Sequence, residues 1–384
     1  MGDGLTVHVD GHQLRIETEP AARLALILET IGNATSSLAL MYYIFAGDVA
    51  GQTVLAALIH ACERGVAVDL IVDGFGSDDQ PDSVFAPLIA AGAKFARFNP
   101  RYGRRYLLRN HQKMLIADGK VALIGGCNIA QAYFSPQEMR ETWVDMILAI
   151  KGPAAARLGA YHVALSNWVH TPRSPVRDLR QLLVDHSEAS GALRWLHSGL
   201  FPRFSPLTRA LRIDIDNARS LVMMEAYFAP NWAMLRKLGQ IMRRGGRCEV
   251  ITAGVSNNTT TVAASRHTYH RLLNFGVSIR EYVRHRLHTK LILIDSISYI
   301  GSANFDARSL YINVELMLRI DDRAFAAQMR DWLTSQIEAT EAITPQKHRV
   351  RATPLNRIRW LVAYFIVSTL DYSVSHRLNI SDRA

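Results

Sequence analysis

The chain has 384 residues, of which 49% are hydrophobic and 20% charged, a composition typical of a folded protein large enough for two domains. Its net charge of +10 favours polyanionic partners, such as nucleic acid, an anionic bilayer or a phosphorylated substrate. Three scattered cysteines exclude a disulfide framework or a zinc site and indicate a reducing compartment. No secretory signal is expected, and no apolar run reaches the roughly 18 residues of a membrane span.

Two long segments of the chain resemble each other element by element. Each begins with helical apolar spacing, passes an Asn-Ala pair and enters a strand, over residues 26–45 and 209–228. In each, a helix follows, ends at a glycine turn and leads into a new apolar strand, the pattern of a parallel or mixed sheet. The repeat predicts two α/β units at 20–172 and 205–342, a linker at 173–204 and a basic, amphipathic tail at 343–384.

The most specific part of the repeat is a pair of predicted hairpins, at residues 110–128 and 287–304. Each hairpin carries a His-x-Lys-x4-Asp motif followed by an asparagine: His111, Lys113, Asp118 and Asn128 in the first, and His288, Lys290, Asp295 and Asn304 in the second. Residues two apart on a strand share a face, so each His and Lys should project into one cavity, with the Asp at the turn. Gly126 and Ser302, in the glycine-rich returns, are expected to offer backbone donors to a phosphate.

This combination of side chains suits attack on a phosphodiester. A neutral histidine is nucleophilic at physiological pH, while lysine and asparagine can hold phosphoryl oxygens as charge builds up. A second histidine on the opposite side can protonate the departing alcohol and deprotonate the incoming one. Two motifs supply both roles without a metal or another cofactor. Coincidental core histidines are a poor explanation, because both motifs stand at the same point of a repeat and use two of only seven lysines.

The two motifs, read as HQKMLIADG…GGCN and HTKLILID…GSANFDARSLYINVE, resemble the paired HKD motifs of the phospholipase D superfamily. The surrounding sequence is similar to that of bacterial cardiolipin synthases over roughly residues 20–340. The resemblance implies two α/β sandwich units related by a pseudo-twofold, with one active site at their interface and a covalent phosphohistidine. It implies His111 as nucleophile and His288 as general acid and base. It also implies that Asp145 and Glu315, which follow the motif histidines, each orient an imidazole. Ser296 departs from the glycine usual in the family.

Two further features bear on the partner. Residues 83–117 contain seven cations and no acid, so Arg104, Arg105 and Arg109 could form a phosphate-gathering rim; a solvated basic face is the alternative. The tail places Trp360, Tyr364 and Phe365 beside Arg357 and Arg359, which indicates an interfacial membrane anchor. A C-terminal helix docked on the body is the alternative.

These observations favour a phosphatidyltransferase that acts on anionic phospholipids and makes cardiolipin from phosphatidylglycerol. A phospholipase D or a nuclease, with water as acceptor, carries the same motifs, because acceptor choice depends on how the site excludes water. A binding protein with a decayed site is disfavoured by the two intact motifs. We expect peripheral binding to the cytoplasmic membrane of a bacterium and no nucleic-acid partner. The oligomeric state stays open.

Overall fold

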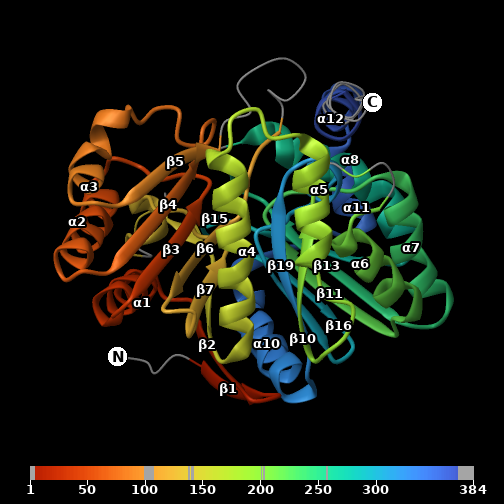
Figure 1. The fold of residues 1–384 in the computed structure, drawn as a ribbon. Helices are drawn as coiled ribbons and strands as arrows, with labels where there is room; N and C mark the ends of the chain where they lie inside the picture. The colour runs from red at the N-terminus through yellow and green to blue at the C-terminus, as the bar shows by residue number, and fades with distance from the viewer. Residues whose placement is uncertain are drawn as a thin grey trace.

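The structure is a computed structural model that describes residues 5–98, 108–136, 139, 142–199, 201, 204–256 and 258–370. Two eight-stranded mixed sheets lie side by side and are flanked by helices (Figure 1). The first sheet consists, in spatial order, of β1 (Leu5–Val9), β2 (His12–Glu17), β9 (Ile147–Lys151), β7 (Val121–Gly125), β6 (Lys113–Ala117), β3 (Ser37–Tyr42), β4 (Ala67–Asp73) and β5 (Lys94–Phe98).

The second sheet repeats this order. It consists of β10 (Leu193–Ser198), β19 (Glu315–Asp321), β17 (Ile297–Gly301), β16 (Lys290–Ile294), β11 (Ser220–Glu225), β13 (Arg247–Ala253), β14 (Ser278–Tyr282) and β20 (Thr340–Ala342). From β2 to β5 and from β10 to β14, equivalent strands occupy equivalent places. The predicted pair of similar α/β units is therefore confirmed.

Helices cover both faces of the two sheets (Figure 1). They are α1 (Pro20–Asn33), α2 (Val49–Glu63), α3 (Ala86–Ala90), α4 (Pro153–His170), α5 (Val176–Asp185), α6 (Pro206–Asn217), α7 (Trp232–Arg243), α8 (Thr259–Asn274), α9 (Ala307–Tyr311), α10 (Arg323–Ser335), α11 (Pro345–Arg351) and α12 (Pro354–Tyr364). The central strands β6 and β16 are buried along their whole length, which explains their continuous apolar sequence. One apolar core includes Ile116 and Leu158 of the first unit together with Trp195 and Met317 of the second.

Short pairings join the two units beside the motif histidines. β8 (Trp143–Val144) of the first unit pairs in parallel with β15 (Arg286–Leu287) of the second. The reciprocal contact is a parallel bridge between Asn110 and Val314. In the first contact, Leu287, which precedes His288, lies beside Val144, which precedes the acid Asp145. In the second, Asn110, which precedes His111, lies beside Val314, which precedes the acid Glu315. The strand pairing thus aligns each histidine with an acid from across the interface.

The segment predicted as a linker, 173–204, contains α5 and the strand β10, which pairs with β19 as part of the second sheet. The first sheet likewise begins before residue 20, because β1 and β2 precede α1. Sequence repetition missed these strands since β1 has no counterpart in the second sheet and β10 lies in a segment rich in Pro, Ser and Arg.

The predicted tail is a folded part of the second unit as far as residue 370. α12 packs on α8, and the side chains of Trp360 and Tyr364 are only 6% and 4% exposed. The Tyr364 hydroxyl donates a hydrogen bond to the Pro230 carbonyl at 2.8 Å. The expectation that these two aromatic side chains enter a membrane is therefore wrong, because they are buried in the fold. Residues 371–384 lie outside the described part of the chain. Within the described residues, no helix is both long and apolar enough to span a bilayer.

Candidate active site

Each motif histidine is held by an acid from the opposite unit. The His111 backbone N–H donates to the Val314 carbonyl at 2.9 Å, and His111 Nδ1 lies 3.0 Å from Glu315 Oε2. The reciprocal pair repeats this geometry, because the His288 N–H donates to the Val144 carbonyl at 2.8 Å and His288 Nδ1 lies 2.7 Å from Asp145 Oδ2. Neither unit alone contains a complete histidine–acid pair.

Burial sets the protonation of this site. It lowers the pKa of His111 to about 4 and that of His288 to about 3, against the ordinary 6.5, with the neighbouring lysine charges acting in the same direction. Burial alone would raise the pKa of Asp145 and Glu315, but the hydrogen bonds and charges of the histidines and lysines outweigh it and lower both. Both acids are therefore ionised and accept from Nδ1–H, so each neutral imidazole presents an Nε2 lone pair.

The motif lysines lie beside the histidines, as their spacing predicts. Lys113 and Lys290 are buried, and each Nζ donates to the carbonyl oxygen of its own motif histidine. Lys113 Nζ also lies 5.1 Å from the centre of the Tyr43 ring, which packs edge-on against His111. Burial lowers the pKa of both lysines from the ordinary 10.5. The charges of Glu315 and Asp145 oppose this shift, and a lysine that is charged away from water acts more strongly on an anion than it would in bulk solvent.

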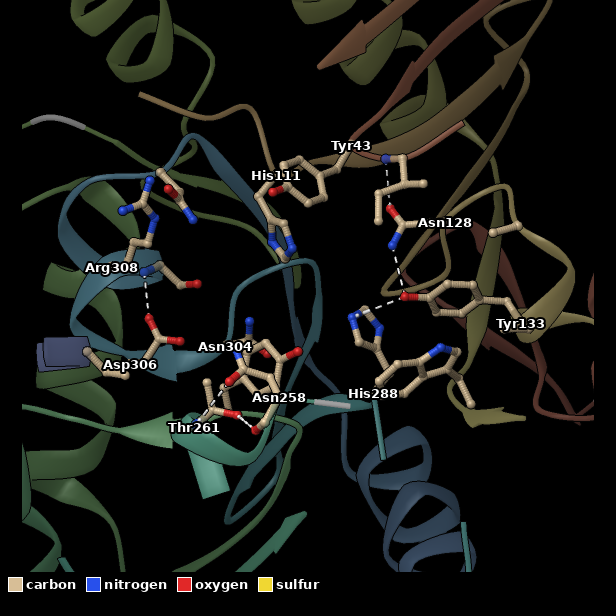
Figure 2. Close-up of a pocket in the computed structure, with 18 of the residues that line it drawn as sticks. Tyr43, His111, Asn128, Tyr133, Asn258, Thr261, His288, Asn304, Asp306 and Arg308 are labelled. Carbon is tan, nitrogen blue, oxygen red and sulfur yellow. Dashed lines mark hydrogen bonds between the residues drawn. The ribbon is translucent and has the colours of Figure 1, made fainter. Parts of the chain in front are cut away.

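The two histidines point toward one another across a cavity of about 790 Å³ (Figure 2). Tyr133 lies on the His288 side, with its hydroxyl 3.3 Å from His288 Nε2 and 2.9 Å from Asn128 Nδ2. Asn128 Oδ1 accepts from the Ile44 N–H at 3.1 Å, so its amide is already engaged. Asn304 also lines the cavity, and its Oδ1 has no hydrogen-bond partner among the described residues. The two predicted asparagines are therefore not equivalent.

The cavity wall has an apolar side and a polar side. Ile44, Ala130, Ala132, Trp143, Ile366 and Val367 supply apolar surface, whereas Asn258, Thr261, Asp306, Arg308, Ser309 and Asn313 supply polar groups. Figure 2 shows Asp306 and Arg308 on the opposite side of the cavity from Tyr133. Such a wall can accept a molecule with a charged head and an apolar body.

The structure does not bring the motif aspartates to the histidines. Asp118 lies at the hairpin turn, at the far end of β6, and its carboxylate accepts from the backbone N–H groups of Thr35, Ser36 and Ser37 at 2.8–3.2 Å. Asp295 accepts in the same way from the N–H groups of Arg219 and Ser220. Their predicted place among the catalytic groups is corrected: they join each hairpin to the neighbouring strand.

Gly126 and Ser302 lie against the two acids that hold the motif histidines. A Cβ at Gly126 would lie 2.5 Å from Asp145 Oδ2, so only glycine leaves room for that carboxylate. The Ser302 hydroxyl donates to Glu315 Oε2 at 2.6 Å, and its backbone N–H is already bonded to the Leu316 carbonyl. The expectation that Ser302 offers its backbone N–H to a phosphate is therefore corrected, and the same expectation for Gly126 stays a prediction.

The predicted arginine rim is only partly described. Arg104 and Arg105 lie outside the described residues. Arg109 is buried, with its guanidinium 4.0 Å from the centre of the Phe75 ring, and it is absent from the cavity wall. Arg109 is therefore not part of the cavity wall, and its membership of a phosphate-gathering rim stays a prediction.

Sequence reasoning missed Tyr133, Trp143, Arg308 and Glu225. The first three line the cavity from elements too short to show a periodic pattern: a three-residue 3₁₀ helix, the two-residue strand β8 and the five-residue helix α9. Glu225 is fully buried at the end of β11, directly opposite Lys290 in the strand register. An acid in an otherwise apolar strand, LVMME, was the available signal for this residue.

The family whose description reads "Cardiolipin synthase, PLD-like domain" matches residues 27–158 and 211–337, which include both motifs and both acids. The chain belongs to this family of the phospholipase D superfamily. It is accordingly a cardiolipin synthase-like enzyme of the phosphatidyltransferase class.

Similar proteins agree with this assignment. The chain is 28% identical to cardiolipin synthase B of Shigella flexneri over 343 residues, which cover 86% of this chain and 81% of that protein. It is 29% identical to cardiolipin synthase 1 of Bacillus anthracis over 306 residues, or 76% of this chain and 60% of that protein. Among solved structures, phosphatidylserine synthase from Haemophilus influenzae shares the fold, with a TM-score of 0.74, 16% identity, and coverage of 98% of this chain and 97% of that one.

Proposed function

We propose that this enzyme transfers a phosphatidyl group from phosphatidylglycerol to the hydroxyl of a second phospholipid and thereby makes cardiolipin. The observation that carries the proposal is the pair of reciprocal histidine–acid contacts, which aims two Nε2 atoms into one cavity from opposite sides. A displacement at phosphorus needs a nucleophile on one side and a proton donor on the other.

In the first step, the lone pair of His111 Nε2 forms a bond to phosphorus. The bond between phosphorus and the oxygen of the headgroup glycerol breaks, and that oxygen takes a proton from His288 Nε2. The negative charge of the bound phosphodiester raises the pKa of His288, and Nε2 takes up this proton from solvent as the substrate binds. Asn304, which lines the cavity, stabilises the phosphoryl oxygens as charge builds up, and the positive charge of Lys113 and Lys290 beside the motif histidines adds to this effect. His288 is then neutral.

In the second step, neutral His288 takes the proton of an acceptor hydroxyl, which attacks phosphorus as the bond to His111 Nε2 breaks. Both histidines return to their starting states, and no group outside the chain is consumed. His111 fits the nucleophile because the Tyr133 hydroxyl already lies 3.3 Å from Nε2 of His288. That hydroxyl also gives His288 a hydrogen-bond partner in both of its protonation states.

The cavity wall supports a phospholipid as substrate. Arg308 and Asn304 on the polar side suit a phosphate-bearing headgroup, while Trp143, Ile366 and Val367 suit the first carbons of acyl chains. The net charge of +10 favours an anionic membrane surface. We therefore place the enzyme peripherally on the cytoplasmic membrane of a bacterium.

The test is to incubate the purified protein with phosphatidylglycerol vesicles and identify lipid and water-soluble products by mass spectrometry. The proposal predicts cardiolipin and free glycerol in equal amounts. Phosphatidic acid as the main lipid product would show that water is the acceptor and the enzyme is a phospholipase D. Cleavage of single-stranded DNA without any change in the lipid would indicate a nuclease.

A further inference from the structure

The helix α12 has two apolar faces, one buried against the protein and one exposed to solvent. One face, with Trp360, Ala363 and Tyr364, is buried in an apolar cluster with Ala263 and Ala264 of α8. This packing fixes the helix on the body of the second unit and determines which side of it faces outward. The position of α12 at the periphery of the molecule is visible in Figure 1.

The other face exposes large apolar side chains to solvent. Leu355, Ile358, Leu361 and Val362 are 75%, 61%, 53% and 51% exposed, and Phe365 follows at 48%. At about 100° per residue, the four residues within α12 lie in a continuous arc about 120° wide. Large apolar side chains that are exposed together in this way mark an interaction surface, whereas single ones need no explanation.

Two arginines border this apolar arc. By helical position, Arg357 lies just outside one edge of the arc and Arg359 just outside the other, and both are exposed. Apolar side chains between flanking cations form the pattern of a helix that lies in the plane of a bilayer, where the cations meet lipid phosphates. A protein partner with an apolar groove would not require cations on both edges.

The exposed face leads along the chain into the wall of the active-site cavity. The chain proceeds from α12 into a π-helical turn at Phe365–Leu370, and Ile366 and Val367 of this turn line the cavity between the two histidines. A membrane that receives the α12 face would therefore lie next to the side of the cavity that Ile366 and Val367 line.

We propose that Leu355, Ile358, Leu361, Val362 and Phe365, here called the α12 outer face, dock the enzyme on an anionic bilayer and place the cavity mouth at the lipid headgroups. This inference rests on the proposed function, since it names the surface through which the substrate is reached. Lipid would pass from the bilayer along Ile366 and Val367 without leaving the apolar phase.

The test compares the wild type with a Leu355→Gln/Ile358→Gln/Val362→Gln variant, which leaves the cavity wall intact. Flotation with vesicles of phosphatidylcholine and phosphatidylglycerol should show at least tenfold weaker binding of the variant. Its activity on phosphatidylglycerol dispersed in detergent should equal that of the wild type. The matched control, Val163→Gln/Val184→Gln/Ile213→Gln, changes exposed apolar side chains on α4, α5 and α6 and should bind vesicles as the wild type does.

Several outcomes would overturn the inference. Equal vesicle binding by the two triple variants would show that the α12 outer face is not the docking surface. A wild-type dimer in lipid-free solution that the first variant dissociates would show that a second copy covers this face. The proposed function is tested separately. Vesicle binding without any lipid product would contradict the proposed reaction but not the docking surface. Turnover of dispersed lipid without vesicle binding would contradict the docking surface but not the proposed reaction.

Discussion

Asp145 and Glu315 hold equivalent histidines although their side chains differ in length by one methylene. The structure compensates at the residue that packs on each carboxylate. Gly126 leaves space for the shorter aspartate to lie against the backbone, whereas Ser302 reaches the longer glutamate with a hydroxyl at 2.6 Å. Each acid therefore remains hydrogen-bonded and fixed, which is what an acid needs in order to hold an imidazole in one tautomer.

Removing the charge of either acid should impair turnover without unfolding the protein. Asp145→Asn and Glu315→Gln keep the size of the side chain but can no longer stabilise the imidazolium or fix the Nδ1–H tautomer. We expect kcat to fall about 10²–10⁴-fold in each, by analogy with the acid of a catalytic triad. Ser302→Ala, which removes only the hydrogen bond to Glu315, should lower kcat by less than tenfold. Steady-state kinetics on dispersed phosphatidylglycerol would check this, and wild-type rates in both amide variants would contradict it.

The two half-sites differ beside their lysines. In the strand register, Tyr42 lies opposite Lys113, whereas Glu225 lies opposite Lys290. Glu225 Oε2 accepts from the Phe305 N–H at 3.1 Å, and its Oε1 has no hydrogen-bond partner among the described residues. Burial raises the pKa of Glu225 well above its ordinary value, although the charge of Lys290 opposes this. The same interaction favours the charged form of Lys290.

This asymmetry predicts a pH effect with a definite sign. In the pH range where Glu225 is ionised, which its raised pKa moves upward, Glu225→Gln removes a negative charge near Lys290, so the pKa of that lysine should fall further below 10.5. The alkaline limb of the kcat/KM profile should then move to lower pH, while the rate on the plateau changes little. Tyr42→Phe is the matched control at the equivalent position and should leave the alkaline limb in place. A shift toward higher pH in Glu225→Gln, or an equal shift in both variants, would contradict the argument.

At the scale of elements, each motif hairpin is fastened at both ends. The histidine end is held by the other unit through Val314 or Val144, and the aspartate end by the neighbouring strand of its own sheet. The turn requires a left-handed backbone at Asp118, with φ of 55°, and at Asp295, with φ of 51°. Aspartate tolerates this conformation better than most residues.

The motif aspartates should therefore affect stability more than chemistry. Asp118→Asn weakens charge-assisted bonds to three consecutive N–H groups and should lower the free energy of unfolding by about 2 kcal/mol. Asp295 accepts from only two N–H groups, so Asp295→Asn should lower the free energy of unfolding by less than Asp118→Asn does. Urea unfolding would measure both effects, and kcat per folded molecule should stay within threefold of wild type. A loss of kcat without a loss of stability would return Asp118 to the catalytic set.

The pKa of the Asp118 carboxylate predicts how the difference in stability between the wild type and Asp118→Asn depends on pH. The backbone N–H groups lower the pKa of Asp118 in the folded state. A depressed folded pKa contributes stability that is present above the unfolded value of about 4 and lost as the pH falls below it. The two proteins should thus differ in stability at neutral pH and converge in acid, as urea midpoints at several pH values would show.

Much of this organisation was readable from the sequence. Repetition gave the two units, and a spacing of two residues correctly placed Lys113 beside His111 and Lys290 beside His288. The same motif misled at Asp118, because spacing identifies a turn without showing that the turn lies a whole strand away from the histidine. Tyr133 lies in a three-residue 3₁₀ helix and Arg308 in the five-residue helix α9, and neither element is long enough to carry a periodic signal. Helical spacing marked α12 as amphipathic, but not which of its faces the body covers.

At the scale of the whole molecule, the exchange of acids makes the two units inseparable in function. Because Glu315 serves His111 and Asp145 serves His288, neither unit can keep half of the activity. We expect His111→Ala and His288→Ala each to lower kcat at least 10³-fold. The kcat of the double variant should be no lower than that of the less active single variant. Residual activity near one half in either single variant would show two independent sites.

The central claim is that His111 carries the phosphatidyl group while His288 moves the protons. A phosphatidyl ester of p-nitrophenol, labelled in its phosphate, tests this directly, because its leaving group needs no proton donor. In His288→Ala, we predict a burst of one nitrophenolate per enzyme and alkali-stable label on the peptide that contains His111. Steady release of nitrophenolate by that variant, or label confined to the His288 peptide in His111→Ala, would mean that His111 does not carry the phosphatidyl group.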